Sequence, residues 1–288
     1  MLLQKDNVNR NAIISLILSA LSFSLMTVCV KKLNNSIPVA EIVLIRSIAS
    51  LLVTRYLLRK ANISPWGKNK SLLCIRGVLG TLALFCIFYT LQNIPLSAAT
   101  IIQYTYPSFT TITGIIFLKE YLKKGSIFGI LIGWLGVIFV AQPKYLLPTG
   151  ENLPFEYVFI GLIGAALTAL AYTTVRKLTE NENSLVIVFY FPLISIPLSI
   201  PFFINEMILP TGENIFWLLG ICFFTQLGQL GITFGLKKIP TAKASSVNYI
   251  QVVFASILGI MFFSESFNLF SLIGAILVFI STLFTFIY

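Results

Sequence analysis

Ten apolar stretches, each about long enough to cross a bilayer, are what most constrains the fold of this 288-residue chain. A hydrocarbon core of roughly 30 Å takes about 20 apolar residues in a helix, whereas barrel strands are about half as long and alternate in polarity. We therefore predict an all-α integral membrane protein with ten transmembrane helices. The predicted spans are residues 12–30, 39–58, 72–91, 96–118, 125–141, 157–175, 185–204, 215–236, 244–264 and 269–287.

Composition excludes several other classes of protein. A charged fraction of 10% and a mean hydropathy of +0.92 are not those of a water-soluble domain. The net charge of +10 does not indicate nucleic-acid binding, because the basic residues lie in short gaps between apolar stretches. The chain has no histidine and no cysteine pair at metal-ligand spacing, so we expect no metal, cofactor or catalytic site. The expected partners are the lipid bilayer and a small-molecule substrate, with the chain as a monomer or homodimer.

The distribution of lysine and arginine predicts the orientation. Fifteen of these residues lie on the side of the two termini, and only Lys31, Lys32 and Lys144 lie on the other side. Basic loops accumulate on the cytoplasmic side of a membrane. We therefore expect a multi-pass protein of a bacterial cytoplasmic membrane with both termini in the cytoplasm.

A shift of 145 residues aligns the second half of the chain with the first. Residues 94–129 and 239–274 then share 12 identities in 36 positions without a gap, and Glu120 meets Glu265. Each half holds five spans, and this odd number means that the two halves have opposite orientations in the membrane. We predict two inverted five-helix repeats, residues 1–143 and 144–288, with a binding site at their interface near the midplane.

The stretch IPLSAATIIQYTYPSFTTITGIIFLKE and its echo IPTAKASSVNYIQVVFASILGIMFFSE resemble the repeated signature of EamA-type carriers in the drug/metabolite transporter superfamily. The resemblance covers the whole chain, because ten spans and a five-plus-five inverted duplication are typical of that family. It implies a secondary active transporter that is not an enzyme. We expect it to export a small polar metabolite, such as an amino acid or a related compound, by alternating access.

The resemblance leaves other functions open. The segment LLCIRG, which opens the third span, is similar to carriers of S-adenosylmethionine and other metabolites, so uptake or exchange of a nucleotide-like cofactor is the alternative. A membrane-embedded lipid enzyme would need clustered acidic or serine side chains, but the acidic residues here are single and dispersed. A non-transporting membrane partner would carry large folded loops, and no loop exceeds about 15 residues.

Arg46 is the strongest candidate for substrate binding. At 1.5 Å per residue it lies within about 4 Å of the midplane of the second span, where a charge is tolerated only in a wet cavity or an ion pair. Glu41 is a poor partner because it lies about 140° away around the helix. We expect Arg46 to bind a carboxylate or phosphate of the substrate, and the structural alternatives are an ion pair or snorkelling.

Uncharged polar side chains recur at helical spacing near the middle of three spans. A buried amide without a partner costs several kcal/mol, so these residues either bond to a neighbouring helix or line a wet cavity. The candidate aromatic walls are Tyr104, Tyr106, Tyr172 and Tyr249. The residues that we expect to face the cavity with Arg46 are Gln103, Tyr106, Gln226, Gln229, Asn248 and Gln251.

Three charged residues near span ends are expected to be structural. Arg76 lies five residues into the third span, so its side chain is expected to snorkel to the cytoplasmic interface. Glu120 and Glu265 close equivalent spans, and each is expected to cap the free N–H groups of the helix that follows it. Proton coupling is the alternative role of the two glutamates.

Small residues and prolines predict how the helices pack and bend. Gly228, Gly231 and Gly235 share the eighth span and are expected to allow a neighbouring helix to approach closely. Pro107 in the fourth span and three prolines in the seventh each remove a backbone hydrogen bond, which predicts kinks there.

Overall fold

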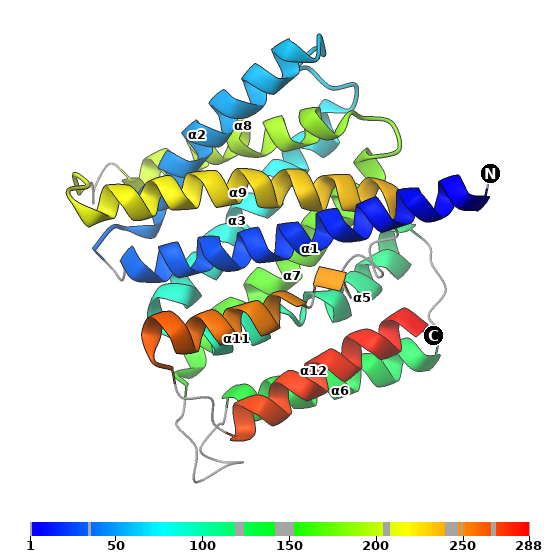
Figure 1. The fold of residues 1–288 in the computed structure, drawn as a ribbon, viewed down its shortest axis with the longest axis vertical. Helices are drawn as coiled ribbons and strands as arrows, with labels where there is room; N and C mark the ends of the chain where they lie inside the picture. The colour runs from blue at the N-terminus through cyan, green and yellow to red at the C-terminus, as the bar shows by residue number, and fades with distance from the viewer. Residues whose placement is uncertain are drawn as a thin grey trace.

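The described part of the chain is helical and contains no strand. The computed structural model describes residues 2–33, 36–118, 124–141, 153–203, 208–239, 247–248, 250–265 and 269–287. The helices are α1 (Leu2–Leu33), α2 (Val39–Lys60), α3 (Lys70–Asn93), α4 (Leu96–Gln103), α5 (Tyr106–Leu118), α6 (Lys124–Ala141), α7 (Phe155–Leu178), α8 (Ser184–Phe203), α9 (Glu213–Lys238), α11 (Ile250–Phe263) and α12 (Leu269–Ile287). The amino end of α1 and the carboxyl end of α12 lie on the same side of the bundle, at the right of Figure 1.

Every predicted span contains helix, and local sequence explains several boundaries. The side chain of Asn69 accepts a hydrogen bond from the Leu72 N–H at 3.1 Å and so caps the start of α3. Helices α2, α4 and α7 each begin directly after a proline. By length and apolar composition alone, five stretches of described helix could each cross a membrane. They are Arg10–Leu33, Lys70–Asn93, Phe155–Leu178, Ser184–Phe202 and Glu213–Lys238.

The fourth predicted span is two helices rather than one kinked helix. Helix α4 ends at Gln103 and α5 begins at Tyr106. Pro107 has no N–H to donate to the carbonyl of Gln103, and its ring collides with that carbonyl in a continuous helix. The three prolines expected to kink the seventh span lie inside α8, which remains helical throughout.

The helix contacts repeat with two-fold symmetry under the 145-residue shift. The shift pairs α1 with α7, α2 with α8, α3 with α9, α5 with α11 and α6 with α12. Accordingly, α1 packs on α9 as α3 packs on α7, and α1 packs on α11 as α5 packs on α7. In the pairs α2–α8 and α6–α12, each helix packs on the helix that the shift aligns with it. These two pairs lie at opposite edges of the bundle (Figure 1).

This symmetry agrees with the predicted fold, an all-α membrane protein built from two inverted five-helix repeats. The boundary predicted at residues 143–144 lies outside the described residues. It stays a prediction.

Glycines bring two of these helix pairs into close contact. A Cβ on Gly231 would lie 2.8 Å from the carbonyl oxygen of Ser15 in α1, and the Ser19 hydroxyl donates to the Gly228 carbonyl at 2.8 Å. The packing role predicted for the glycines of the eighth span is therefore confirmed. Gly136 in α6 and Gly274 in α12 likewise allow their two helices to pack closely, because a Cβ on either would lie less than 3.0 Å from the carbonyl oxygen of the other.

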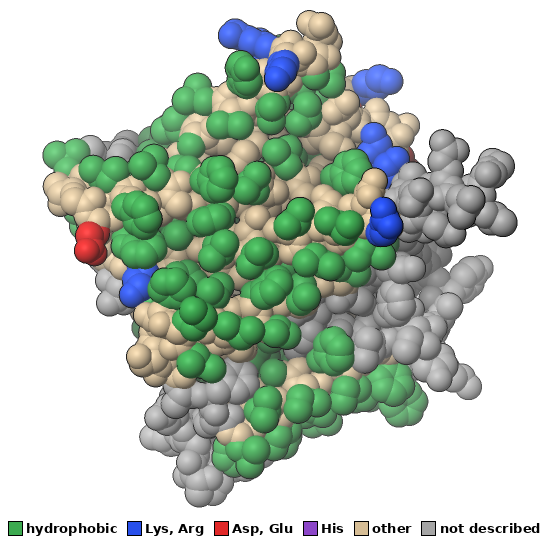
Figure 2. Space-filling view, in the orientation of Figure 1, with side chains coloured by type: hydrophobic (Ala, Val, Ile, Leu, Met, Phe, Trp, Pro, Cys, Tyr) green, Lys and Arg blue, Asp and Glu red, His purple; other side chains and the backbone are tan. Residues whose placement is uncertain are grey.

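Figure 2 shows the face formed by α1 and α9, where hydrophobic side chains form a broad continuous surface. Lysine and arginine side chains gather toward the top and right margins of this face. Exposed side chains of the surface include Ile14 and Leu18 of α1 and Phe216, Leu219 and Phe223 of α9. A soluble monomer rarely exposes so large an apolar patch. This face is therefore suited to contact with lipid.

Candidate functional site

A cavity lies between the two halves of the bundle. Its walls come from α1, α2 and α3 of the first half, the α4–α5 break, α7, α8 and α9 of the second half, and the stretch around Asn248 and Gln251. Its polar lining residues are Thr27, Arg46, Arg76, Gln103, Tyr104, Tyr106, Thr168, Tyr172, Gln229, Asn248 and Gln251. Ligand pockets commonly combine apolar walls with a few converging polar groups, as this cavity does.

Six of the seven predicted site residues line this one cavity. They come from α2, the α4–α5 region, α9 and the start of the ninth span, and they are Arg46, Gln103, Tyr106, Gln229, Asn248 and Gln251. Their role in binding stays a prediction. Gln226 is the exception, because its side chain lies between α9 and α2, where it accepts from the Ser50 hydroxyl at 2.6 Å and donates to the Thr54 hydroxyl at 3.1 Å. Gln226 thus links helices and does not face the cavity.

Arg46 lies in the cavity wall with only 1% of its surface exposed. Its guanidinium carbon lies 5.0 Å from the centre of the Phe191 ring in α8. Its Nε and Nη2 have no hydrogen-bond partner among the described residues. Glu41 is occupied elsewhere, because its carboxylate accepts the backbone N–H of Ile208 at 3.1 Å. The expected absence of a pair with Glu41 therefore holds in the structure.

The snorkelling predicted for Arg76 is wrong. The residue is 3% exposed, and its side chain turns into the same cavity, with its guanidinium carbon 4.2 Å from the centre of the Phe191 ring. Its Nη2 donates to Gln229 Oε1 at 3.2 Å, while Nε and Nη1 have no partner among the described residues. The prediction failed because it considered only how far Arg76 lies from the end of its own helix, α3. Helix α8, which packs on α3, supplies the ring that holds the guanidinium inside.

Gly80 provides the space for this arrangement. It lies one turn after Arg76 on α3, and a Cβ there would lie 2.5 Å from Arg76 Nη1 and 2.9 Å from Cε2 of Phe191. Any larger residue would therefore push the guanidinium or the ring away. Phe191 gives no polar signal in the sequence, so the prediction of the site missed it. Arg76 carried such a signal as the one charged residue inside the third predicted span.

Two positive charges share this buried region. The guanidinium carbons of Arg46 and Arg76 lie 5.0 Å and 4.2 Å from the centre of the same Phe191 ring. The distance between the two carbons is therefore at most the sum of these distances, 9.2 Å. At that separation and an effective dielectric constant of about 20, like charges repel by roughly 2 kcal/mol. In the described part of the chain, neither guanidinium forms an ion pair with a carboxylate. Contacts with an aromatic face contribute about 0.5–2 kcal/mol each, which does not offset the cost of burying two charges.

Tyrosines form an aromatic wall beside the two arginines. The rings of Tyr104 and Tyr106 lie 5.4 Å apart, and those of Tyr106 and Tyr172 also lie 5.4 Å apart with a perpendicular edge-to-face geometry. The Tyr104 hydroxyl donates to Gln251 Oε1 at 2.7 Å, which joins the two halves of the chain across the cavity. The break between α4 and α5 puts these groups here, and non-helical backbone at membrane depth is tolerated where it lines a cavity.

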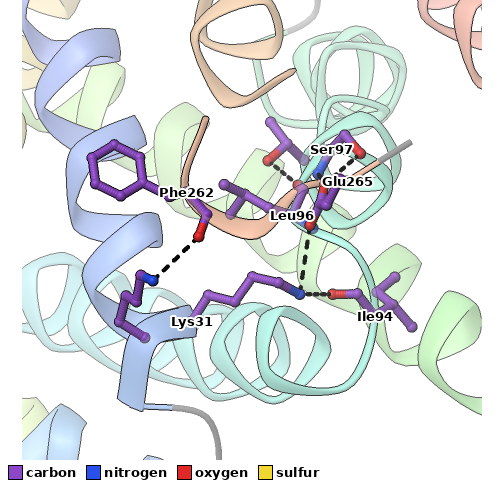
Figure 3. A network of polar contacts seen from close by, with 8 residues as sticks. Lys31, Ile94, Leu96, Ser97, Phe262 and Glu265 are labelled. Carbon is purple, nitrogen blue, oxygen red and sulfur yellow. Dashed lines mark hydrogen bonds and ion pairs between the residues drawn. The ribbon is translucent and has the colours of Figure 1, made fainter. Parts of the chain in front are cut away.

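The cap predicted for Glu265 exists, but it serves a different helix. Its carboxylate accepts the backbone N–H groups of Leu96 at 2.6 Å and Ser97 at 3.2 Å, and the Ser97 hydroxyl at 2.9 Å (Figure 3). These are the first N–H groups of α4, in the other half of the chain, and not those of the following helix α12. Lys31 completes the network, since its Nζ lies 3.7 Å from the carboxylate and donates to the Ile94 carbonyl at 2.7 Å. The equivalent residue Glu120 lies outside the described residues.

The comparison with protein families assigns the chain to a class. The model of the EamA-like transporter family matches it twice, at residues 10–142 and 156–287. A protein of Pseudomonas aeruginosa named the pseudopaline exporter CntI is 28% identical over 93% of this chain and 93% of its own length. An uncharacterised transporter of Helicobacter pylori is 28% identical over 93% of this chain and 92% of its own length. Mouse solute carrier family 35 member G1 is 29% identical over 92% of this chain and 75% of its own length.

The fold is also found among solved structures. A crystal structure matches with a TM-score of 0.68 over 98% of this chain and 96% of the matched chain, at 14% sequence identity. At that identity the match shows a shared fold alone. The family match covers both halves, and the relatives are transporters rather than enzymes. This chain is therefore a multi-pass membrane transporter of small molecules that belongs to the EamA-like transporter family.

Proposed function

We propose that the protein is a secondary active exporter of a small polar metabolite that carries an anionic group. The observation that carries the proposal is Arg46, a buried cation in the central cavity whose Nε and Nη2 have no partner among the described residues. A permanently charged guanidinium at membrane depth is expected to serve a substrate. The relative named an exporter supports the direction of transport.

The proposed mechanism is alternating access between the two inverted repeats. The cavity draws its walls from both repeats, so rocking one repeat against the other would expose it to each side in turn. The break between α4 and α5, which lines the cavity, is the proposed place for the chain to bend in this motion. The proposed setting is a bacterial cytoplasmic membrane with both termini in the cytoplasm.

The test compares metabolites inside and outside cells of a host that expresses the protein. Export predicts at least one anionic metabolite that is enriched outside in cells with the wild-type protein, compared with cells without it. Arg46→Gln is expected to abolish this difference while the folded protein still reaches the membrane, and Arg46→Lys is expected to retain part of it. Arg59→Gln, on the exposed end of the same helix, is the matched control and is expected to export normally.

Three results would contradict the proposal. Enrichment inside the cells would indicate uptake, as expected for the alternative carrier of a nucleotide-like cofactor. Normal export by Arg46→Gln would make the arginine structural. Loss of export only in proportion to lost expression would lead to the same conclusion.

A further inference from the structure

We propose that the cavity binds a substrate with two anionic groups, one on Arg46 and the other on Arg76. This inference rests on the proposed function and adds to it the charge and the spacing of the substrate. Both guanidiniums line the same cavity, both are almost fully buried, and both contact the Phe191 ring.

The unpartnered atoms of Arg46 form a binding edge. Nε and Nη2 of a guanidinium point in parallel from one side of the group, and this is the edge that accepts both oxygens of a carboxylate. On Arg46 both of these atoms are buried and have no hydrogen-bond partner among the described residues. The Phe191 ring, 5.0 Å from the guanidinium carbon, restricts the orientation of the group. Arg46 therefore lines the cavity with a guanidinium that has unused hydrogen-bond donors for a carboxylate.

Arg76 offers a second, differently constrained position. Gln229 accepts from Nη2 at 3.2 Å, which leaves Nε and Nη1 without a partner in the part of the chain that the structure describes. Nη1 packs directly against Gly80, where a Cβ would lie only 2.5 Å from it. Helix α9 thus binds Nη2 of the guanidinium, while Nε and Nη1 are not bonded to any described residue.

The charge balance favours two anionic groups over one. Because neither arginine pairs with a carboxylate among the described residues, a substrate with a single negative charge would give a counter-charge to only one of them. The guanidinium carbons lie at most 9.2 Å apart, the sum of their distances of 5.0 Å and 4.2 Å from the shared ring. Two carboxylates on a short carbon chain can reach both positions. The tyrosine rings of the cavity would contact the chain between them.

The test measures ligand-induced stabilisation of the purified full-length protein in detergent. The probes are straight-chain dicarboxylates from succinate to pimelate, each compared with the monocarboxylate of the same chain length. We expect at least one dicarboxylate to raise the melting temperature and to bind at least about tenfold more tightly than its monocarboxylate, because it gains a second charge-assisted contact. Arg76→Gln is expected to remove this advantage and to leave the two probes equal.

Two further measurements separate a binding role of Arg76 from a structural one. Without ligand, Arg76→Gln is expected to melt at the same temperature as the wild type or higher, because it removes a buried charge that has no counter-charge. A structural role predicts a lower melting temperature instead. Arg59→Gln is the control and is expected to keep the preference for dicarboxylates.

The inference is overturned if no dicarboxylate of the series binds better than its monocarboxylate, or if Arg76→Gln keeps the preference. The export assay distinguishes this failure from failure of the proposed function. Export that is lost in Arg46→Gln but unchanged in Arg76→Gln would leave an anion exporter with one anion-binding arginine. Export that is unchanged in both variants would refute the proposed function as well.

Discussion

Replacing Glu265 tests how the two halves of the protein are joined. The residue follows α11 in the second half, yet its carboxylate accepts three hydrogen bonds from Leu96 and Ser97 at the start of α4 in the first half. Its side chain is only 10% exposed, so water replaces these bonds poorly. Glu265→Ala would leave the first N–H groups of α4 without their acceptor.

The magnitude follows from what the carboxylate contacts. Loss of a side-chain cap at a helix start costs about 0.5–2 kcal/mol, and a hydrogen bond to a charged group contributes about 1.5–3 kcal/mol. These terms overlap, so we expect Glu265→Ala to lower the free energy of unfolding by about 2–4 kcal/mol. Glu265→Gln keeps one acceptor oxygen, so it should lower the free energy of unfolding by only about 1–2 kcal/mol. The Lys31 ion pair, at 3.7 Å and partly exposed, should add less than about 1 kcal/mol.

The assay is reversible unfolding of the purified protein in mixed micelles, followed by tryptophan fluorescence. Lys31→Met combined with Glu265→Gln gives a double-mutant cycle that isolates the ion pair. Glu180→Gln, an exposed glutamate after α7, is the matched control and should change nothing measurable. A loss below about 1 kcal/mol for Glu265→Ala would refute the capping argument. A coupling energy as large as the whole loss would show that the ion pair dominates.

Three other predictions address packing, the site and the orientation. Gly136→Leu should lower the free energy of unfolding by about 1–3 kcal/mol, because a Cβ there lies 2.8 Å from the Gly274 carbonyl oxygen, and mixed-micelle unfolding checks this. Gln226→Leu should lower the free energy of unfolding by about 1 kcal/mol, because it removes the hydrogen bond with Ser50. It should leave substrate affinity unchanged, because the side chain lies outside the cavity. Thermal melting checks the first result and ligand titration the second. Trp66→Cys, in the exposed α2–α3 loop of a cysteine-free variant, should react with an impermeant maleimide only after the cells are permeabilised. Labelling in intact cells would show that the predicted orientation is wrong.

Length and repetition determined the architecture. Apolar stretches of bilayer length and the 145-residue shift were enough to predict an all-helical membrane protein of two inverted repeats, because both signals lie along the chain. The same reasoning placed Arg46 and five polar residues in one cavity. Their periodicity on each helix indicates which side faces inward, and inward-facing groups at one depth converge.

The sequence misled at three residues whose partners come from another helix. Arg76 is near enough to the end of α3 to snorkel, but Phe191 of α8 and Gln229 of α9 hold it inside. Glu265 is followed directly by the last predicted span, but it caps α4. Gln226 has the spacing of a cavity residue, but Ser50 lies opposite it.

The physical reason is the same in each case. Hydropathy and helical periodicity are properties of one segment, so the sequence by itself determined the spans, the repeat and the inward face of each helix. A hydrogen bond, a cation–π contact or a helix cap depends on two segments that are distant in the chain. Only the tertiary structure decided that both buried arginines share one aromatic ring and that a glutamate of one repeat caps a helix of the other.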